Sequence, residues 1–102
     1  MKDVFVDYLR CCIPNKHWRY KESAHLFVKA ETPLAILHEA ARLLGLRREW
    51  FRDPPKSMPH YDLCRSKREK AVAIGIEELD MGETGRIVRA WREFRRQGGQ
   101  VR

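Results

Sequence analysis

The sequence predicts a small single-domain α/β (or α+β) protein, in which a sheet of about three strands is covered by three helices. Two segments near the N-terminus alternate like strands, and three later segments carry helix start and stop signals. A short strand-like segment separates the last two helices, so strands and helices alternate along the chain. The 102 residues, of which 43% are hydrophobic, can bury one core. We expect one domain over residues 1–97 and a frayed tail over 98–102.

The first two strands are expected at residues 3–8 and 23–30. The segment DVFVDY alternates apolar residues with others, which is typical of a strand with one buried face. In SAHLFVKA, the even-numbered apolar residues should point to one face, and His25 and Phe27 to the other. The residues between these segments are expected to form a loop.

The first helix is expected to begin at Thr32, whose hydroxyl can cap backbone N–H groups, with Pro33 in the first helical position. Apolar residues then recur at helical spacing as far as Gly45, which suits a C-terminal stop. His38 lies at the edge of this apolar stripe, where a histidine commonly serves the core. Residues 46–62 contain three prolines and are expected to form a loop, and loops of this length are often functional.

The second and third helices each begin with a predicted capping box. Ser66 with Glu69 starts the second helix, and Asp80 with Glu83 starts the third. Between them, the segment IEEL at residues 76–79 indicates a short strand at the edge of the sheet. The third helix is expected to bury an apolar stripe formed by Ile87, Trp91 and Phe94.

Positive charge is concentrated in the Arg-rich C-terminal helix, residues 81–97. The chain carries a net charge of +7, and residues 83–102 contain six arginines against two glutamates. Such a surface favours anionic partners, and an arginine face can lie along nucleic-acid phosphates. It can equally be a solubilising face or a contact with an acidic protein. The arginines concerned are Arg86, Arg89, Arg92 and Arg96.

The number and spacing of the cysteines and the hydropathy of the chain indicate its cellular compartment. Three cysteines, two of them adjacent, make a poor disulfide framework and lack the spacing of a structural zinc site. No apolar run approaches the roughly 18 residues of a membrane helix, and the N-terminus lacks the apolar region of a signal peptide. We expect a cytoplasmic protein with reduced thiols and no membrane contact. The sequence does not predict an oligomeric state.

The order of the motifs resembles a known family. VFVD, SAHL, LHEAARLLGL, RREWF, PHYDL and SKREKAVAIG follow one another as in a bacterial and phage family of uncharacterised proteins marked by a His-Tyr-Asp-Leu motif. The resemblance covers about residues 2–80 and leaves the Arg-rich helix outside. It implies no activity, because none is established for the family. It does indicate which positions matter, and these are His25, His38, His60, Asp62 and Asp7.

The candidate catalytic residues are His60, Asp62, His25 and His38. Imidazole acts as acid, base or metal ligand near neutral pH, and a neighbouring carboxylate fixes its tautomer. If the histidines converge where the sheet meets the first helix, Asp7, His25, His38 and His60 are candidate ligands for a divalent metal. Without metal, His60 can act as acid or base on a phosphodiester, with Asp62 orienting it. No recognised metal-binding motif is present, so a purely structural role also stays open.

Basic and aromatic residues flank these positions. In RREWFR, Arg48 and Trp50 suit phosphate contact and base stacking, although Trp50 and Phe51 can instead fill the core. In RSKREK, Lys67 and Arg68 lie near a helix start and suit an anion, or can be solvated surface.

These observations predict a basic domain that binds a phosphate-bearing ligand, a nucleotide or a nucleic-acid end, in a pocket lined by His and Asp. If the protein is an enzyme, hydrolysis of phosphodiester bonds fits best. The alternative is a non-catalytic adaptor that binds nucleic acid or protein through the Arg-rich helix, and a third reading is a protein that sequesters a small ligand without turnover. A chain that ends at Asp80 is expected to keep the first function, provided that the remainder still folds, and to lose the adaptor function.

Overall fold

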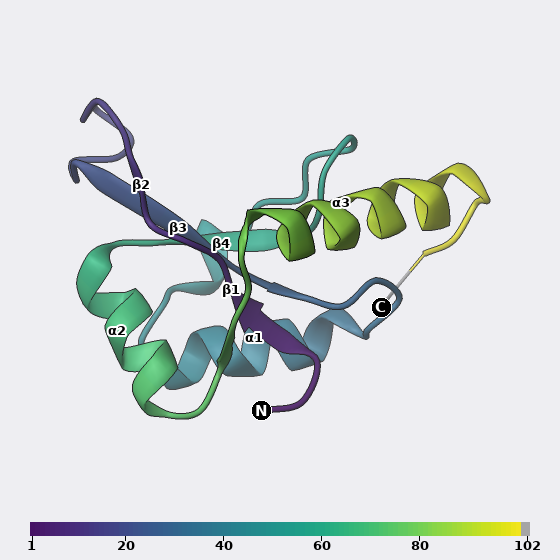
Figure 1. Ribbon diagram of the computed structural model, residues 1–102, viewed down its shortest axis with the longest axis horizontal. Coiled ribbons are helices and arrows are strands. Elements are labelled where there is room, and N and C mark those ends of the chain that lie inside the picture. The colour runs from purple at the N-terminus through teal and green to yellow at the C-terminus, as the bar shows by residue number, and fades with distance from the viewer. Residues whose placement is uncertain (101–102) are drawn as a thin grey trace.

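The computed structural model describes residues 1–100 and confirms the mixed α/β class. The strands are β1 (Val4–Val6), β2 (Arg10–Cys11), β3 (Glu22–Val28), β4 (His60–Leu63) and β5 (Glu77–Glu78). The helices are α1 (Leu34–Leu43), α2 (Arg65–Ala73) and α3 (Met81–Arg96), with a short 3-10 helix η1 (Arg48–Trp50). Figure 1 shows α1 and α2 below the strands and α3 above them. No helix among the described residues is long and apolar enough to span a membrane.

Strand β3 is the centre of the sheet. It pairs antiparallel with β1 and β2 along one side and with β4 along the other, and β5 joins the far side of β1 in parallel. Because helices lie on both sides of the sheet, β3 buries residues on both faces, including Leu26 on one and Phe27 on the other. The predicted alternation is confirmed, and the predicted edge strand at residues 76–79 is present as β5.

The sheet has five strands rather than about three, and the main error concerns β4. Residues 46–62 were expected to form a loop, yet His60–Leu63 pairs residue by residue with β3. Tyr61 and Leu63 are buried while His60 and Asp62 are partly exposed, which is a strand pattern that the preceding prolines conceal. The second missed strand, β2, is only two residues long. As a result, His60 and Asp62 lie on a paired strand and not on a loop.

The helices begin within two residues of the predicted starts, but two of the three predicted side-chain caps are not formed. Helix α1 begins after Pro33 without a side-chain cap from Thr32, and α2 begins one residue before Ser66. Both helices are held by packing against the sheet rather than by capping, as is usual for short helices. The capping box of Asp80 and Glu83 at the start of α3 is confirmed.

Helix α3 belongs to the core of the domain. Trp91 is 1% exposed and donates its indole N–H to the carbonyl of Val28 at 3.0 Å. Arg95 lies 5.7 Å from the Trp91 ring centre and pairs with Asp53 at 2.6 Å, so it ties the helix to the segment before β4. A chain that ends at Asp80 would lose this buried ring, so such a truncation cannot separate the two functions as expected.

The predicted frayed tail is partly ordered. The backbone N–H of Gly98 donates to Arg95, and that of Gly99 donates to Phe94, so residues 98 and 99 close the helix. Gly98 has a φ of +81°, a conformation that a glycine adopts without strain. The last two residues of the predicted tail, 101 and 102, lie outside the described part of the chain.

Replacing Trp91 with Ala is expected to lower the free energy of unfolding by about 3–5 kcal/mol, because the change empties a buried site and leaves the Val28 carbonyl without its donor. The matched control is Trp50→Ala, because the Trp50 side chain is 48% exposed and its loss should cost less than about 1 kcal/mol. Urea unfolding followed by circular dichroism measures both. Equal losses would contradict the role of Trp91 in fixing α3 to the sheet.

Candidate functional site

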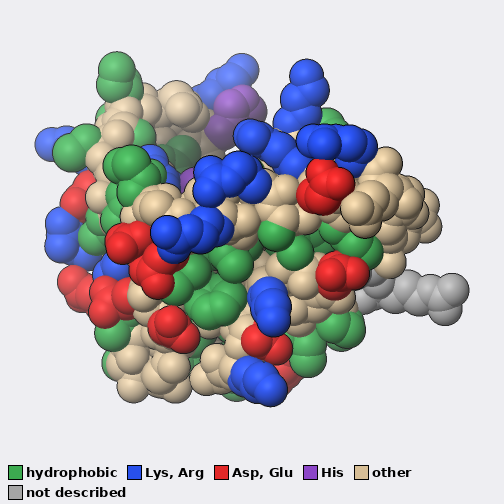
Figure 2. All heavy atoms as spheres, turned by 45° about the vertical axis from the view of Figure 1, so that its right-hand side comes forward, with side chains coloured by type: hydrophobic (Ala, Val, Ile, Leu, Met, Phe, Trp, Pro, Cys, Tyr) green, Lys and Arg blue, Asp and Glu red, His purple; other side chains and the backbone are tan. Residues whose placement is uncertain are grey.

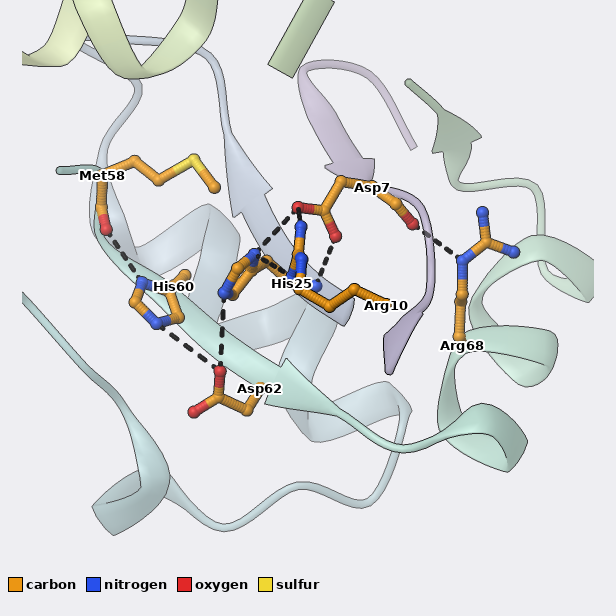
Figure 3. A network of polar contacts seen from close by, with 7 residues as sticks. All are labelled: Asp7, Arg10, His25, Met58, His60, Asp62 and Arg68. Atoms are coloured by element: carbon orange, nitrogen blue, oxygen red, sulfur yellow. Dashed lines mark hydrogen bonds and ion pairs between the residues drawn. The ribbon is translucent and has the colours of Figure 1, made fainter. Parts of the chain in front are cut away.

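Four polar side chains meet on one face of the sheet. Asp7 follows β1, His25 is in the middle of β3, and His60 and Asp62 are on β4. His25 is paired with Asp62, and the backbone N–H of Asp7 donates to the carbonyl of His25. Because paired residues on neighbouring strands point to the same face, the four side chains lie together, as Figure 3 shows.

A bulge brings Arg10 to the same face. Asp7 is opposite His25 and Arg10 is opposite Ser23, so two residues between them face a single residue of β3. Without this extra residue, Asp7 and Arg10 would point to opposite faces, since they are an odd number of positions apart. With it, Arg10 Nη2 donates to Asp7 Oδ2 at 2.8 Å.

The carboxylate of Asp7 is fully buried and fully paired. It accepts hydrogen bonds from the backbone N–H of His25 at 2.6 Å, from the His25 ring at 2.8 Å and from Arg10. Burial raises the pKa of Asp7, but the hydrogen bonds and charge of His25 and the hydrogen bond from Arg10 outweigh it, and the pKa lies below its usual range. Asp7 is therefore ionised at neutral pH.

Asp7 fixes the tautomer of His25. An ionised carboxylate can only accept, so His25 Nδ1, 2.8 Å from Asp7 Oδ2, carries the proton. Arg10 Nη1 also lies 3.0 Å from this nitrogen, but a guanidinium can only donate, so the contact is not a hydrogen bond. The other ring nitrogen, Nε2, lies 3.7 Å from Asp62 Oδ1.

His60 is oriented in the same way by a backbone carbonyl. Its Nδ1 lies 3.0 Å from the carbonyl oxygen of Met58, which can only accept, so Nδ1 donates and Nε2 keeps a lone pair. That Nε2 also lies 3.7 Å from Asp62 Oδ1. Burial lowers the pKa of His60, and the hydrogen bond to Met58 opposes this effect without cancelling it, so the ring is neutral.

Three metal-ligand atoms therefore converge from His25, His60 and Asp62, all within 4.8 Å of one another. In a tetrahedral zinc site with bonds of about 2.0–2.1 Å, ligand atoms lie about 3.4 Å apart, so the two 3.7 Å distances require only small adjustments. Two imidazoles and one carboxylate are the ligands of some catalytic zinc sites and of non-haem iron(II) sites. Both rings already donate through Nδ1, as metal-bound histidines usually do. Within residues 1–100, this is the only such cluster.

His38, predicted to join this cluster, lies on the other side of the sheet. Its Nδ1 is 2.8 Å from the hydroxyl of Tyr61, which points away from its neighbours His60 and Asp62 on β4. Burial and then the charge of Arg48 lower the pKa of His38, whereas burial raises the pKa of Tyr61. The phenol therefore donates to a neutral imidazole, and the pair is a structural contact between α1 and the sheet.

A cavity of about 460 Å³ opens beside Asp62. Its walls come from the β2–β3 hairpin, from the segment around η1 and from the start of α2. They combine aromatic and basic side chains, namely Trp18, Tyr20, Trp50, Lys16, Arg19, Arg52 and Lys67, with Glu49 as the second acidic residue after Asp62. Of the predicted ligand-binding residues, Trp50 and Lys67 line this cavity, whereas Arg48 and Arg68 do not.

Arg48 and Arg68 have other partners. The guanidinium of Arg48 lies 5.1 Å from the centre of the Phe51 ring, on the same side of the sheet as His38. Arg68 donates to the backbone carbonyl of Asp7 at 2.7 Å and pairs with Glu78 at 2.9 Å, so it connects α2 to β1 and β5.

Sequence reasoning missed several residues of the site. No local sequence pattern indicates Arg10 as a site residue, because its position next to Asp7 depends on the bulge. Arg52 belongs to the RREWFR segment that the sequence indicated for phosphate contact, but its position beside His60 depends on backbone pairing beyond a turn rich in proline. The aromatic hairpin residues, Trp18 and Tyr20, are visible in the sequence, but their proximity to Trp50 depends on the fold.

The chain matches the model of a family described as Protein of unknown function (DUF4031) over residues 4–91. No curated protein and no solved structure matches it. The match continues past residue 80 into α3 and includes Trp91, so it reaches further than the resemblance that ends near residue 80.

Replacing Asp7 with Asn is expected to lower the free energy of unfolding by about 2–4 kcal/mol, because Arg10 and the His25 ring lose the anion that holds them. Asp62→Asn is the matched control. The Asp62 side chain is 32% exposed, so its change should cost less than about 1 kcal/mol. Urea unfolding with a chelator present measures both, and a similar small cost at both positions would contradict the role of Asp7.

Stability should also depend on pH through His38. The folded protein keeps His38 neutral because its pKa is lowered, whereas the unfolded chain binds the proton at about pH 6.5. The stabilisation that comes from keeping His38 neutral is therefore fully present above about pH 6.5, and it is lost as the pH falls from there through the lowered pKa of His38. Between pH 7 and pH 5, we expect the free energy of unfolding to fall less in His38→Gln than in the wild type. Urea titrations with chelator at both pH values test this, and an equal fall in the two proteins would refute it.

Proposed function

The chain belongs to the family described as Protein of unknown function (DUF4031), and from its side chains we propose that it is a metal-dependent hydrolase of phosphate esters. The observation that carries this proposal is the convergence of two imidazole Nε2 atoms, of His25 and His60, with the carboxylate of Asp62. All three side chains are partly exposed, so a ligand can reach them.

The convergence of three ligand atoms from His25, His60 and Asp62 favours a metal over acid–base catalysis by histidine alone. The Nδ1 atoms of both rings donate to Asp7 and Met58, which orients the Nε2 atoms toward Asp62. The same orientation suits a general base, so the inference of a metal depends on the third ligand and not on the rings alone. Two imidazole nitrogens and one carboxylate oxygen are suitable ligands for a divalent transition metal.

Unpaired positive charge next to Asp62 supports a phosphate-bearing substrate. Within the described residues, the cavity residues Lys16, Arg19, Arg52 and Lys67 form no salt bridge. Lys67 donates one hydrogen bond to the carbonyl of Leu44 at 2.8 Å, which leaves two of its three protons for a ligand. These cations can neutralise phosphate oxygens beside the cluster.

The reaction that fits this arrangement is the attack of water on phosphorus. A bound divalent cation would supply an activated water and would neutralise the charge that develops on the phosphate. The water oxygen bonds to phosphorus as the ester P–O bond breaks, the water gives up a proton to the solvent, and the leaving oxygen takes one. His25, His60 and Asp62 would hold the cation, Asp7 and Met58 keep the two rings oriented, and Arg52 and Lys67 would bind the phosphate.

Metal binding and hydrolysis are tested separately. We expect calorimetry with Zn²⁺, Mn²⁺ and Co²⁺ to show one site per chain for at least one of these ions. The affinity should fall by at least tenfold in His60→Ala, and by about 10–100-fold in Asp7→Asn, which removes only the partner of a ligand. His38→Ala is the matched histidine control and should bind like the wild type.

Hydrolysis of bis(p-nitrophenyl) phosphate should be abolished by a chelator, restored by the ion that binds, and absent in Asp62→Ala. Retained metal affinity in a His25→Ala, His60→Ala double variant would refute the site. Binding of metal without hydrolysis of any phosphate ester would refute the activity and leave a metal-binding protein.

A second candidate, the nucleic-acid or protein adaptor, is supported by part of the α3 surface. Figure 2 shows Lys and Arg side chains gathered in the upper half of the face in view. Arg86 and Arg89 are exposed and form no salt bridge within residues 1–100, whereas Arg92 donates to the carbonyl of Lys56 and Arg96 pairs with Glu93. An Arg86→Ala, Arg89→Ala double variant should lose the partner if this candidate holds, and should keep full hydrolytic activity if it does not.

A further inference from the structure

We propose that the cavity beside Asp62 binds an unpaired stretch of single-stranded nucleic acid, with its bases stacked on Trp50 and on the hairpin aromatics. This inference rests on the proposed hydrolase function only for the bond that is cut. The binding itself depends on the walls of the cavity and not on the metal ligands.

The two neighbouring aromatics of RREWFR separate in the structure. Phe51 packs into the core, with its ring centre 4.8 Å from that of His38 and 5.7 Å from that of Tyr61. Trp50 points outward, is 48% exposed and lines the cavity. The core therefore does not need Trp50, and its indole offers an apolar surface to a planar ligand.

A second aromatic surface faces the same cavity from the β2–β3 hairpin. The rings of Trp18 and Tyr20 lie 5.1 Å apart edge to face, and Trp18 is fixed by the hydrogen bond of its indole N–H to the carbonyl of Glu22 at 3.1 Å. The hairpin tip is closed by reciprocal backbone bonds between Asn15 and Trp18. The hairpin aromatics are therefore positioned before any ligand arrives.

Charge and size select nucleic acid as the occupant. Four cations, Lys16, Arg19, Arg52 and Lys67, stand among the aromatics, and Glu49 and Asp62 are the acidic residues of the wall. Aromatic rings interleaved with cations bind successive bases and phosphates of a single strand. The cavity of about 460 Å³ lies within the range of about 300–1,000 Å³ that small-ligand sites occupy, so it suits unstacked nucleotides and not a base-paired duplex.

The position of the cavity connects this binding to the cluster. Asp62 belongs to both, because its carboxylate faces His25 and His60 and it also lines the cavity. Arg52 pairs through its backbone with His60, so a phosphate on Arg52 would lie next to the cluster. A strand held by its bases would therefore bring one of its phosphodiester bonds to the candidate metal site.

The test is fluorescence anisotropy with a labelled 12-nucleotide single strand, at low salt and with a chelator, so that the metal plays no part. We expect Trp50→Ala to weaken binding by about 5- to 150-fold, the loss typical of one stacked base. Trp50→Phe should restore most of the affinity because it keeps an aromatic ring. Arg52→Ala and Lys67→Ala should each reduce the slope of log K against log salt by about 0.7.

Three controls make the result decisive. The same strand in a duplex should bind at least tenfold more weakly, poly-glutamate of equal charge should not displace the single strand, and the Arg86→Ala, Arg89→Ala variant should bind like the wild type. Equal affinity in Trp50→Ala, or equal affinity for the duplex, would overturn the inference. If oligonucleotide binding fails while calorimetry still shows the metal site, only this inference is refuted and the proposed function is not. If the protein binds the oligonucleotide but calorimetry shows no metal binding, the proposed function is refuted and this inference is supported.

Discussion

The buried carboxylate of Asp7 is the group on which the site depends. Burying an ionised carboxylate is costly unless its oxygens are paired, and here they accept from the His25 backbone, the His25 ring and Arg10. The carbonyl of the same residue accepts from Arg68, so one residue connects β1 to β3, to the bulge before β2 and to α2. Because these contacts are internal to the protein, His25 presents its Nε2 in a fixed direction without any ligand. The cluster is therefore preorganised, which is what a metal or substrate site requires.

The alternation of side chains along β4 divides the chemistry of the protein between two faces. His60 and Asp62 point to the face that also holds Asp7, while Tyr61 points to α1 and receives His38 as its partner. Two histidines thus take opposite roles, although both are partly buried and both have a lowered pKa. What distinguishes them is the partner of Nδ1. The carbonyl of Met58 accepts a hydrogen bond from His60 Nδ1 and leaves Nε2 free, whereas the hydroxyl of Tyr61 donates a hydrogen bond to His38 Nδ1.

The limits of the sequence as a guide follow from the range of each interaction. Strand β3 and the capping box at Asp80 depend on neighbours within a few residues, so their patterns can be recognised in the sequence. Strand β4 is defined by pairing with residues more than thirty positions earlier, and the prolines before it predict a loop. The edge position of His38 on its helix was correctly inferred, but the face of the sheet that the helix covers is a matter of topology. Arg10 and Asp7 are only three residues apart, but their contact could not be predicted from the sequence because it requires a bulge.

The cavity and the cluster have different physical tasks, and each explains a feature that the other leaves unexplained. The cluster accounts for two histidines whose Nδ1 atoms are satisfied and whose Nε2 atoms face one carboxylate, but it offers no surface for the remainder of a substrate. The cavity offers aromatic and cationic walls that the core does not need, but Asp62 is the only member of the cluster among its lining residues. Hydrolysis of a phosphodiester gains much of its rate from holding the reacting bond in position. Asp62 belongs to both the cluster and the cavity. A nucleic-acid strand bound along the cavity walls would therefore lie next to a residue that would hold the cation. Binding and chemistry would then both depend on β4.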